Sequence, residues 1–295
     1  MAREVSPTVS RRRLAAELRR LREDAHLTGG QVARSLGWST SKISRIENAQ
    51  VGAQKDDVAA LADLYGSPPE WRDLLLALSL EAEERGWWEG YADVLSESYS
   101  TYIGLEAGAA SMVTWQSLVL PGLLQTSAYA RATMRGGLPF VTLSPGKANR
   151  MISRLVDVRI HRQSLLDDDP PLHFSALIDE SALRRRYGSE EVMRQQLQYI
   201  LELANRPHVA VRVLPLSADH RAIPDRFVLL RFPERERLGS LHGDVVFIEN
   251  AYDASFREDE DETYYFDQLF RQMMEEALSP EESLALIARE AHREN

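Results

Sequence analysis

The segment of residues 27–47, LTGGQVARSLGWSTSKISRIE, constrains the fold of this chain more than any other. Thr28 is placed to cap the amino terminus of a short helix, and Gln31 three residues later completes a capping box. Gly37 then provides a tight turn, because glycine adopts left-handed backbone conformations at little steric cost. Ser39 is placed to cap a second helix. The segment is therefore predicted to form a helix-turn-helix.

The two predicted helices each have an apolar face at helical spacing. These inward residues are Val32, Ala33 and Leu36 on the first helix and Ile43 and Ile46 on the second. The opposite face of the second helix carries small hydroxyl groups and cations, at Thr40, Ser41, Lys42, Ser44 and Arg45. Such side chains can reach base edges and phosphates in the major groove of DNA. We therefore expect these five residues, with Thr28 and Ser39, to bind double-stranded DNA.

Two less specific interpretations stand beside this one. A short bundle with leucine and isoleucine spacing could be any helical domain, although the turn, the caps and the polar face together favour DNA binding. A serine or threonine hydroxyl contacts phosphate as readily as a base, so the role of each hydroxyl stays open.

Further helices are predicted around this segment. Leucines spaced by four and three predict an amphipathic helix over residues 11–25. Asn48 is expected to take the left-handed conformation that ends a helix. Helices at residues 57–65 and after a capping Ser67 complete five helices by residue 79, and a charged linker, EAEERG, follows. We predict a helix-turn-helix domain over residues 1–79.

The remaining residues, 80–295, mix strand and helix patterns. Apolar and β-branched runs predict strands at residues 112–120, 172–178, 209–214, 227–232 and 245–248. Helical periodicity occupies residues 147–166, 190–203 and 264–278, and a capping box at Ser279 and Glu282 starts a last helix. Without a regular strand–helix repeat, an α+β fold is favoured over a doubly wound sheet. The fold class is thus α+β, an all-α five-helix domain followed by a mixed dimerisation, effector or partner-binding domain.

Charge is distributed unevenly along the chain. Residues 1–55 hold eleven Lys/Arg against five Asp/Glu, a net +6, and the rest holds 24 against 40, a net −16. A basic amino-terminal region attracts phosphate and an acidic remainder repels it, although a need for solubility explains the same imbalance. The chain has no cysteine, no apolar leader and no apolar run of the roughly 18 residues that a membrane span needs. We expect a soluble, cytoplasmic protein without a membrane partner.

No motif for catalysis or for cofactor binding is evident. P-loop, GxGxxG, GxSxG and HExxH patterns are missing, and the histidines are scattered. Asp179 and Glu180 are adjacent carboxylates at a predicted strand end, and they suit a helix cap better than an acid–base pair. We therefore expect no enzyme, no cofactor and no metal site.

Five strings carry a resemblance to a known family: GWSTSKISRIE, GWWEGYADV, TYIGLEAGAASMVTWQSLVLPGLLQTSAYARA, LIDESALRR and LSPEESLALIA. Residues 11–78 resemble the Cro and phage-repressor type of helix-turn-helix domain, called XRE-type. The whole chain resembles an actinobacterial group of such transcriptional regulators with a C-terminal domain of unknown function. In that group a very small partner protein often accompanies the regulator, an arrangement described as toxin–antitoxin-like.

The resemblance also implies roles for individual residues. It places Thr40, Ser41 and Arg45 toward the groove, with Lys42 and Ser44 beside them. It implies an ion pair between Arg22 and Glu47 that joins the first and third helices. Two positions depart from the family pattern: Gly29 stands where a glutamine usually contacts phosphate, and Ala49 stands where glycine is usual. Weaker DNA contact by each subunit would make a dimer or a partner more important.

Three functions are consistent with these features of the sequence. The first is a dimeric, sequence-specific transcription regulator that reads an inverted-repeat operator. The second is an antitoxin-like protein that mainly binds a small protein and binds DNA to regulate its own gene. The third is an enzyme or small-molecule sensor with a DNA-binding appendage, which a pocket lined by convergent polar groups would favour.

Overall fold

The computed structural model describes residues 6–137, 143–218, 224–235, 239–240, 243–249 and 254–293. The chain divides into two compact units. The first, which we call the helical unit, comprises residues 4–89 and 233–242. The second, the sheet unit, comprises residues 1–3, 90–232 and 243–295. No helix in the described parts of the chain has both the length and the apolar character that crossing a membrane requires.

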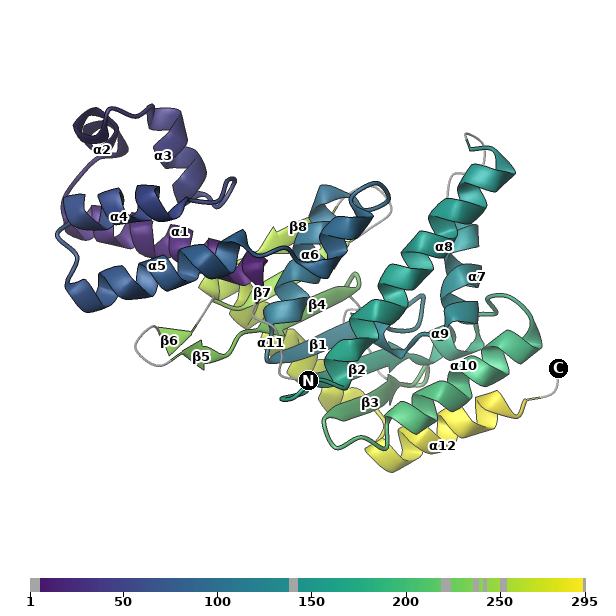
Figure 1. The fold of residues 1–295 in the computed structure, drawn as a ribbon. Helices are drawn as coiled ribbons and strands as arrows, with labels where there is room; N and C mark the ends of the chain where they lie inside the picture. The colour runs from purple at the N-terminus through teal and green to yellow at the C-terminus, as the bar shows by residue number, and fades with distance from the viewer. Residues whose placement is uncertain are drawn as a thin grey trace. The chain divides into compact units, whose positions relative to one another are not determined.

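The helical unit contains the five predicted helices (Figure 1). They are α1 (Pro7–Asp24), α2 (Gly29–Leu36), α3 (Thr40–Glu47), α4 (Lys55–Leu64) and α5 (Pro69–Glu83). Each helix contributes apolar side chains to one common core, including Leu18, Val32, Ile43, Val58 and Leu75, all at most 2% exposed. Because burial of each such side chain contributes about 1.5–3 kcal/mol, this core holds the short helices in place. A short 3₁₀ helix, η1 (Trp87–Tyr91), follows α5.

Three local expectations in this unit are wrong. Asn48 has φ −98°, and the left-handed residue is its neighbour Ala49, with φ +54°. Helix α5 has Pro68 at its N-cap position and no side-chain cap, so Ser67 does not cap it. The same helix continues to Glu83, so the first half of the expected linker is helical. Helix α5 runs through residue 80 without a break. The domain boundary expected between residues 79 and 80 stays a prediction.

The sheet unit is built on a six-stranded mixed sheet of order β3-β2-β1-β4-β7-β8. The strands are β1 (Ser111–Gln116), β2 (His173–Asp179), β3 (Val209–Leu214), β4 (Phe227–Arg231), β7 (Val245–Glu249) and β8 (Ala254–Arg257). Strands β1, β2 and β3 are parallel, whereas β4, β7 and β8 pair antiparallel to their neighbours. The mixed pairing confirms the α+β class. A separate short ladder, which belongs to the helical unit, joins β5 (Glu234–Arg235) to β6 (Gly239–Ser240).

Helices pack around this sheet (Figure 1). The longer ones are α6 (Glu97–Gly108), α7 (Ser127–Gly137), α8 (Pro145–His161), α10 (Glu190–Leu203), α11 (Glu260–Glu276) and α12 (Pro280–Ala291). The shorter ones are η2 (Gly122–Leu124), η3 (Arg162–Leu166) and α9 (Glu180–Arg184). Asp179 caps α9 by accepting from the backbone of Ser181, as expected of a helix cap. Ser279 and Glu282 form the predicted capping box of α12.

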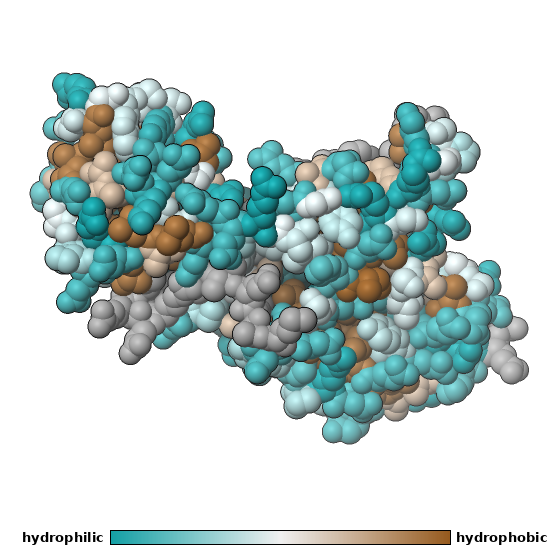
Figure 2. Space-filling model, in the orientation of Figure 1, coloured by the Kyte–Doolittle hydropathy of each residue, from teal (hydrophilic) through white to brown (hydrophobic). Residues whose placement is uncertain are grey.

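The core of the sheet unit lies where the central strands meet α11. Trp115 on β1 is fully buried, with Leu177 of β2 and Phe227 of β4 as its register partners. Phe270 and Met273 of α11 pack against this cluster. On the face shown in Figure 2, hydrophilic residues cover most of the described surface and apolar residues form small groups between them.

Candidate nucleic-acid interface

The turn between α2 and α3 has the predicted geometry. The Thr28 hydroxyl accepts from the Gln31 backbone at 3.3 Å, and the Gln31 side chain accepts from the Thr28 backbone at 2.8 Å. These two bonds satisfy amide groups that the start of a helix leaves unpaired. Gly37 ends α2 in the left-handed region, with φ +68°. The capping box and the glycine turn are therefore confirmed.

Helix α3 is oriented by its two isoleucines. Ile43 and Ile46 are each only 2% exposed, since they pack into the core of the helical unit. Ser39 caps the helix, its hydroxyl accepting from the Lys42 backbone at 3.1 Å. The opposite face is open to solvent and carries Thr40, Ser41, Ser44 and Arg45, all exposed. A polar helix face of this kind can enter a major groove without a steric obstacle.

The two cations of α3 differ in their surroundings. Among the described residues no carboxylate forms an ion pair with Arg45, so its guanidinium is free to meet an external acceptor. Lys42 is engaged instead: its Nζ lies 2.7 Å from a carboxylate oxygen of Asp57 on α4. The same Nζ lies 3.8 Å from the ring centroid of Trp38. Arg45 is therefore the better candidate for recognition, and Lys42 reaches DNA only by sharing or leaving Asp57.

The hydroxyls at the helix starts serve the fold and stay exposed. Thr28 and Ser39 cap α2 and α3, and both side chains remain accessible. Ser44 accepts from the Asn48 side-chain amide at 3.3 Å. A capped helix amino terminus presents backbone amides and the positive end of the helix dipole, which suit a phosphate.

An ion pair joins α1 to α3 as the family resemblance implies. The Arg22 guanidinium donates to both carboxylate oxygens of Glu47, at 2.7 and 3.0 Å. It also donates to the Leu27 carbonyl at 2.8 Å, ahead of α2. The hydrogen bond to Glu47 raises the pKa of Arg22, so the charge persists at any physiological pH. This contact fixes the carboxyl end of α3 relative to α1.

The two departures from the family pattern have different structural settings. A Cβ added at Gly29 would lie 3.7 Å from Ile43 Cγ2, an ordinary contact, so packing does not require glycine there. Ala49 occupies the left-handed conformation that glycine favours, and an alanine there carries a strain of about 1–2 kcal/mol.

Comparisons with known proteins match both parts of the chain. A family model described as a helix-turn-helix domain matches residues 13–75. A second family model, described as a domain of unknown function (DUF5753), matches residues 99–289. No curated protein and no solved structure matches the chain.

Proposed function

The chain belongs to the family of the domain of unknown function DUF5753, and on that premise we propose that it is a sequence-specific transcriptional regulator of the XRE type. The observation that carries the proposal is the face of α3. Its hydroxyls and Arg45 are exposed on one side, while Ile43 and Ile46 hold the other side in the core. Such a helix can read base edges in the major groove of DNA.

Each proposed contact has a physical basis. Thr40, Ser41 and Arg45 face outward along α3 and are assigned to base edges. Lys42 and Ser44 are assigned to phosphates or to neighbouring edges. The exposed caps Thr28 and Ser39 complete the interface, because helix amino termini bind phosphate.

We further propose that the regulator binds as a homodimer. Two α3 helices related by a two-fold axis would enter successive major grooves about 34–36 Å apart and read an inverted repeat. Gly29 lacks the phosphate contact that the family's usual glutamine makes, so one subunit binds DNA more weakly. A second subunit therefore contributes more to the total affinity. The sheet unit would then supply dimerisation and reception of a signal, without enzymatic activity. Sedimentation of the full chain as a monomer at micromolar concentration would count against the dimer.

Substitution of Arg45 tests the recognition role of α3. The operator is first obtained by genome-wide capture of DNA bound to the full chain. Arg45→Ala should then reduce the preference for operator over random DNA by about 1–3 kcal/mol, if the guanidinium forms hydrogen bonds to a guanine. Arg19→Ala is the matched control, since Arg19 is an exposed arginine of α1 in the same unit. Equal losses of affinity for operator and random DNA would show that Arg45 contacts phosphate and not a base.

The second candidate is an antitoxin-like protein whose main role is to bind a small partner protein. Its support is the family resemblance together with the extent of the DUF5753 match, residues 99–289, which leaves a large unit for a role other than DNA binding. Purification from the native host, followed by mass spectrometry, distinguishes the two functions. This candidate would be favoured by a small protein that co-purifies in stoichiometric amount even when the α3 face is disrupted by substitution.

A further inference from the structure

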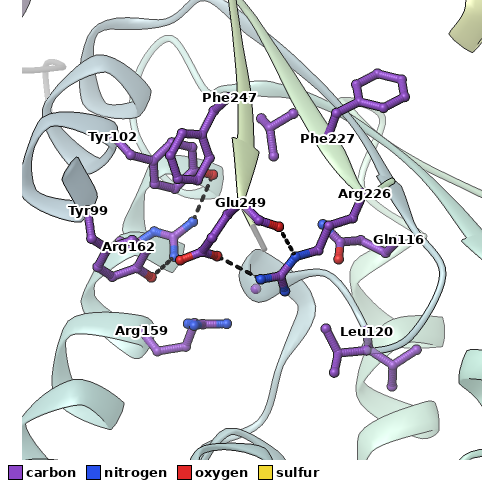
Figure 3. Close-up of a pocket in the computed structure, with 13 residues that line it drawn as sticks. Tyr99, Tyr102, Gln116, Leu120, Arg159, Arg162, Arg226, Phe227, Phe247 and Glu249 are labelled. Atoms are coloured by element: carbon purple, nitrogen blue, oxygen red, sulfur yellow. Dashed lines mark hydrogen bonds and ion pairs between the residues drawn. The ribbon is translucent and has the colours of Figure 1, made fainter. Parts of the chain in front are cut away.

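A small polar hollow, partly open to solvent, lies within the sheet unit (Figure 3). It is bordered by α6, by the junction of α8 with η3, by β4 and β7, and by the segment after β1. Three arginines line it: Arg159, Arg162 and Arg226. Arginine guanidinium groups bind carboxylates and phosphates well, so the charge balance of these three residues decides what the hollow can hold.

Two of the three arginines are already neutralised. Arg162 forms a buried ion pair with Glu106, at 2.6 Å. Arg226 donates to the Glu249 carboxylate at 3.0 Å and to the Glu249 backbone carbonyl at 2.8 Å. Both arginines therefore have a carboxylate partner, and neither adds a net charge to the hollow.

Arg159 carries the remaining positive charge. Its Nη1 donates to Gln125 Oε1 at 3.1 Å, and that amide is uncharged. Its Nε is buried and has no hydrogen-bond partner. Within the described residues no carboxylate forms an ion pair with Arg159. The charge of Arg159 is therefore not balanced by a carboxylate, so a carboxylate or phosphate from outside the chain would supply the missing counter-charge.

The string PGLLQT, residues 121–126, positions this arginine. A Cβ added at Gly122 would lie 3.0 Å from Arg159 Nη1 and 3.4 Å from its Cδ, so the glycine makes room for the side chain. Gln125 is 1% exposed and is anchored twice: its side-chain amide donates to the Leu120 carbonyl at 2.7 Å, and its backbone carbonyl accepts from the Gln163 side chain. This segment therefore holds at the hollow a guanidinium that has no carboxylate partner among the described residues.

The wall around Arg159 is partly apolar. Five apolar residues border the hollow, and all but the first are buried: Val119, Leu120, Phe227, Val228 and Phe247. Pockets for small ligands commonly combine such apolar surface with a few fixed polar groups.

We propose that this hollow binds a small organic anion, with its carboxylate or phosphate group on Arg159 and its apolar part against Val119 and Val228. The carboxylate and the phosphate share the chemistry that a guanidinium recognises, which is two acceptor oxygens in one plane. Binding itself does not depend on the proposed DNA-binding function. Only a regulatory effect of the ligand would depend on it.

Calorimetric titration of the full chain tests the site with three probes of similar shape: benzoate, phenyl phosphate and the neutral benzamide. We expect saturable binding of at least one anion at millimolar concentration and much weaker binding of benzamide. The tighter anion identifies the head group. Because the titration contains no DNA, failure of the proposed DNA-binding function would leave its result unchanged.

Two variants locate the binding. Arg159→Gln should weaken anion binding by about tenfold or more, because it removes a charge-assisted hydrogen bond. Arg150→Gln removes the same charge from an exposed position on α8 and should bind like the wild type. Gly122→Ala should also weaken binding, since its methyl group would displace the Arg159 guanidinium.

Three results would overturn the proposal. They are an affinity for benzamide equal to that for the tighter anion, wild-type affinity in Arg159→Gln, and no saturable binding of either anion. The comparison of anion with neutral probe uses only the wild-type chain, so it decides the matter even if a variant fails to fold.

Discussion

The Arg162 guanidinium donates two hydrogen bonds to the Glu106 carboxylate, at 2.7 and 2.6 Å, where the two side chains are 4% and 0% exposed. Tyr99 accepts a further bond from Arg162 at 2.6 Å, and the Tyr102 hydroxyl donates to Glu106 at 2.8 Å. The pair joins α6 to η3, and Arg162 lines the hollow in the sheet unit. Both charges are thus paired and hydrogen-bonded, as burial demands.

Glu106→Gln should lower the free energy of unfolding by about 3–5 kcal/mol, because it leaves the Arg162 charge buried without a counter-charge. Chemical denaturation of the full chain, followed by circular dichroism, measures the change. Glu97→Gln removes an exposed carboxylate from the first turn of the same helix and should cost well under half as much. Similar losses for the two variants would mean that Arg162 finds another partner.

Burial and the neighbouring Glu106 carboxylate raise the pKa of Tyr102 well above its usual value near 10. Above about pH 10 the unfolded chain loses a proton that the folded chain keeps, so this contribution is complete below pH 10 and declines as pH rises. Tyr102→Phe should reduce the alkaline slope of unfolding free energy by up to about 1.4 kcal/mol per pH unit. Tyr264→Phe, at a residue 65% exposed, should keep the wild-type slope. An unaltered slope in Tyr102→Phe would show that Tyr102 ionises normally in the fold.

Ala49→Gly should stabilise the helical unit by about 0.5–1 kcal/mol. The relief of left-handed strain exceeds the entropy that glycine adds to the unfolded chain. The melting temperature of the full chain and denaturant unfolding both report this change. Ala16→Gly should do the opposite and cost about 1 kcal/mol, since Ala16 is exposed within α1. Destabilisation by Ala49→Gly would mean that the loop tolerates alanine without strain.

Lys42→Ala should flatten the dependence of DNA affinity on salt, lowering the slope of log K against log salt by about 0.9 for one lost phosphate contact. Asp57→Asn should raise DNA affinity instead, because it frees the Lys42 ammonium and removes a carboxylate beside the interface. Filter binding over a range of salt concentrations measures both slopes. An unchanged slope in Lys42→Ala would show that this side chain stays with Asp57 in the complex.

Local chemistry predicted the helical unit well. The caps Thr28 and Ser39, the turn at Gly37 and the buried isoleucines of α3 follow from residues within a few positions of one another. Contact of the α3 face with DNA stays a prediction. The partner of Lys42 could not be foreseen, because Asp57 lies fifteen residues away on another helix.

Prediction was weaker in the sheet unit, for a physical reason. The sequence does not predict helix α6, because five consecutive residues of it are buried and no periodic polar face is visible: Tyr102, Ile103, Gly104, Leu105 and Glu106. Strand β8 is short and contains Ser255 and Arg257, which weakens the apolar signal of a strand. Strands β1 to β4 and β7 were found within a few residues of their true ends, since their apolar runs are long.

Short-range patterns in the amino-acid sequence were enough to establish the helix-turn-helix, the mixed architecture and the uneven charge. Pairing across long separations required the fold, since Glu106 and Arg162 are 56 positions apart and Gln125 and Arg159 are 34 apart. Caps and periodicity act within one or two helical turns, so they are visible in a string of letters. Whether a charged side chain meets an opposite charge depends on which strands and helices come together. For this reason Arg162 is paired with Glu106, whereas Arg159 has only the uncharged Gln125 among the described residues.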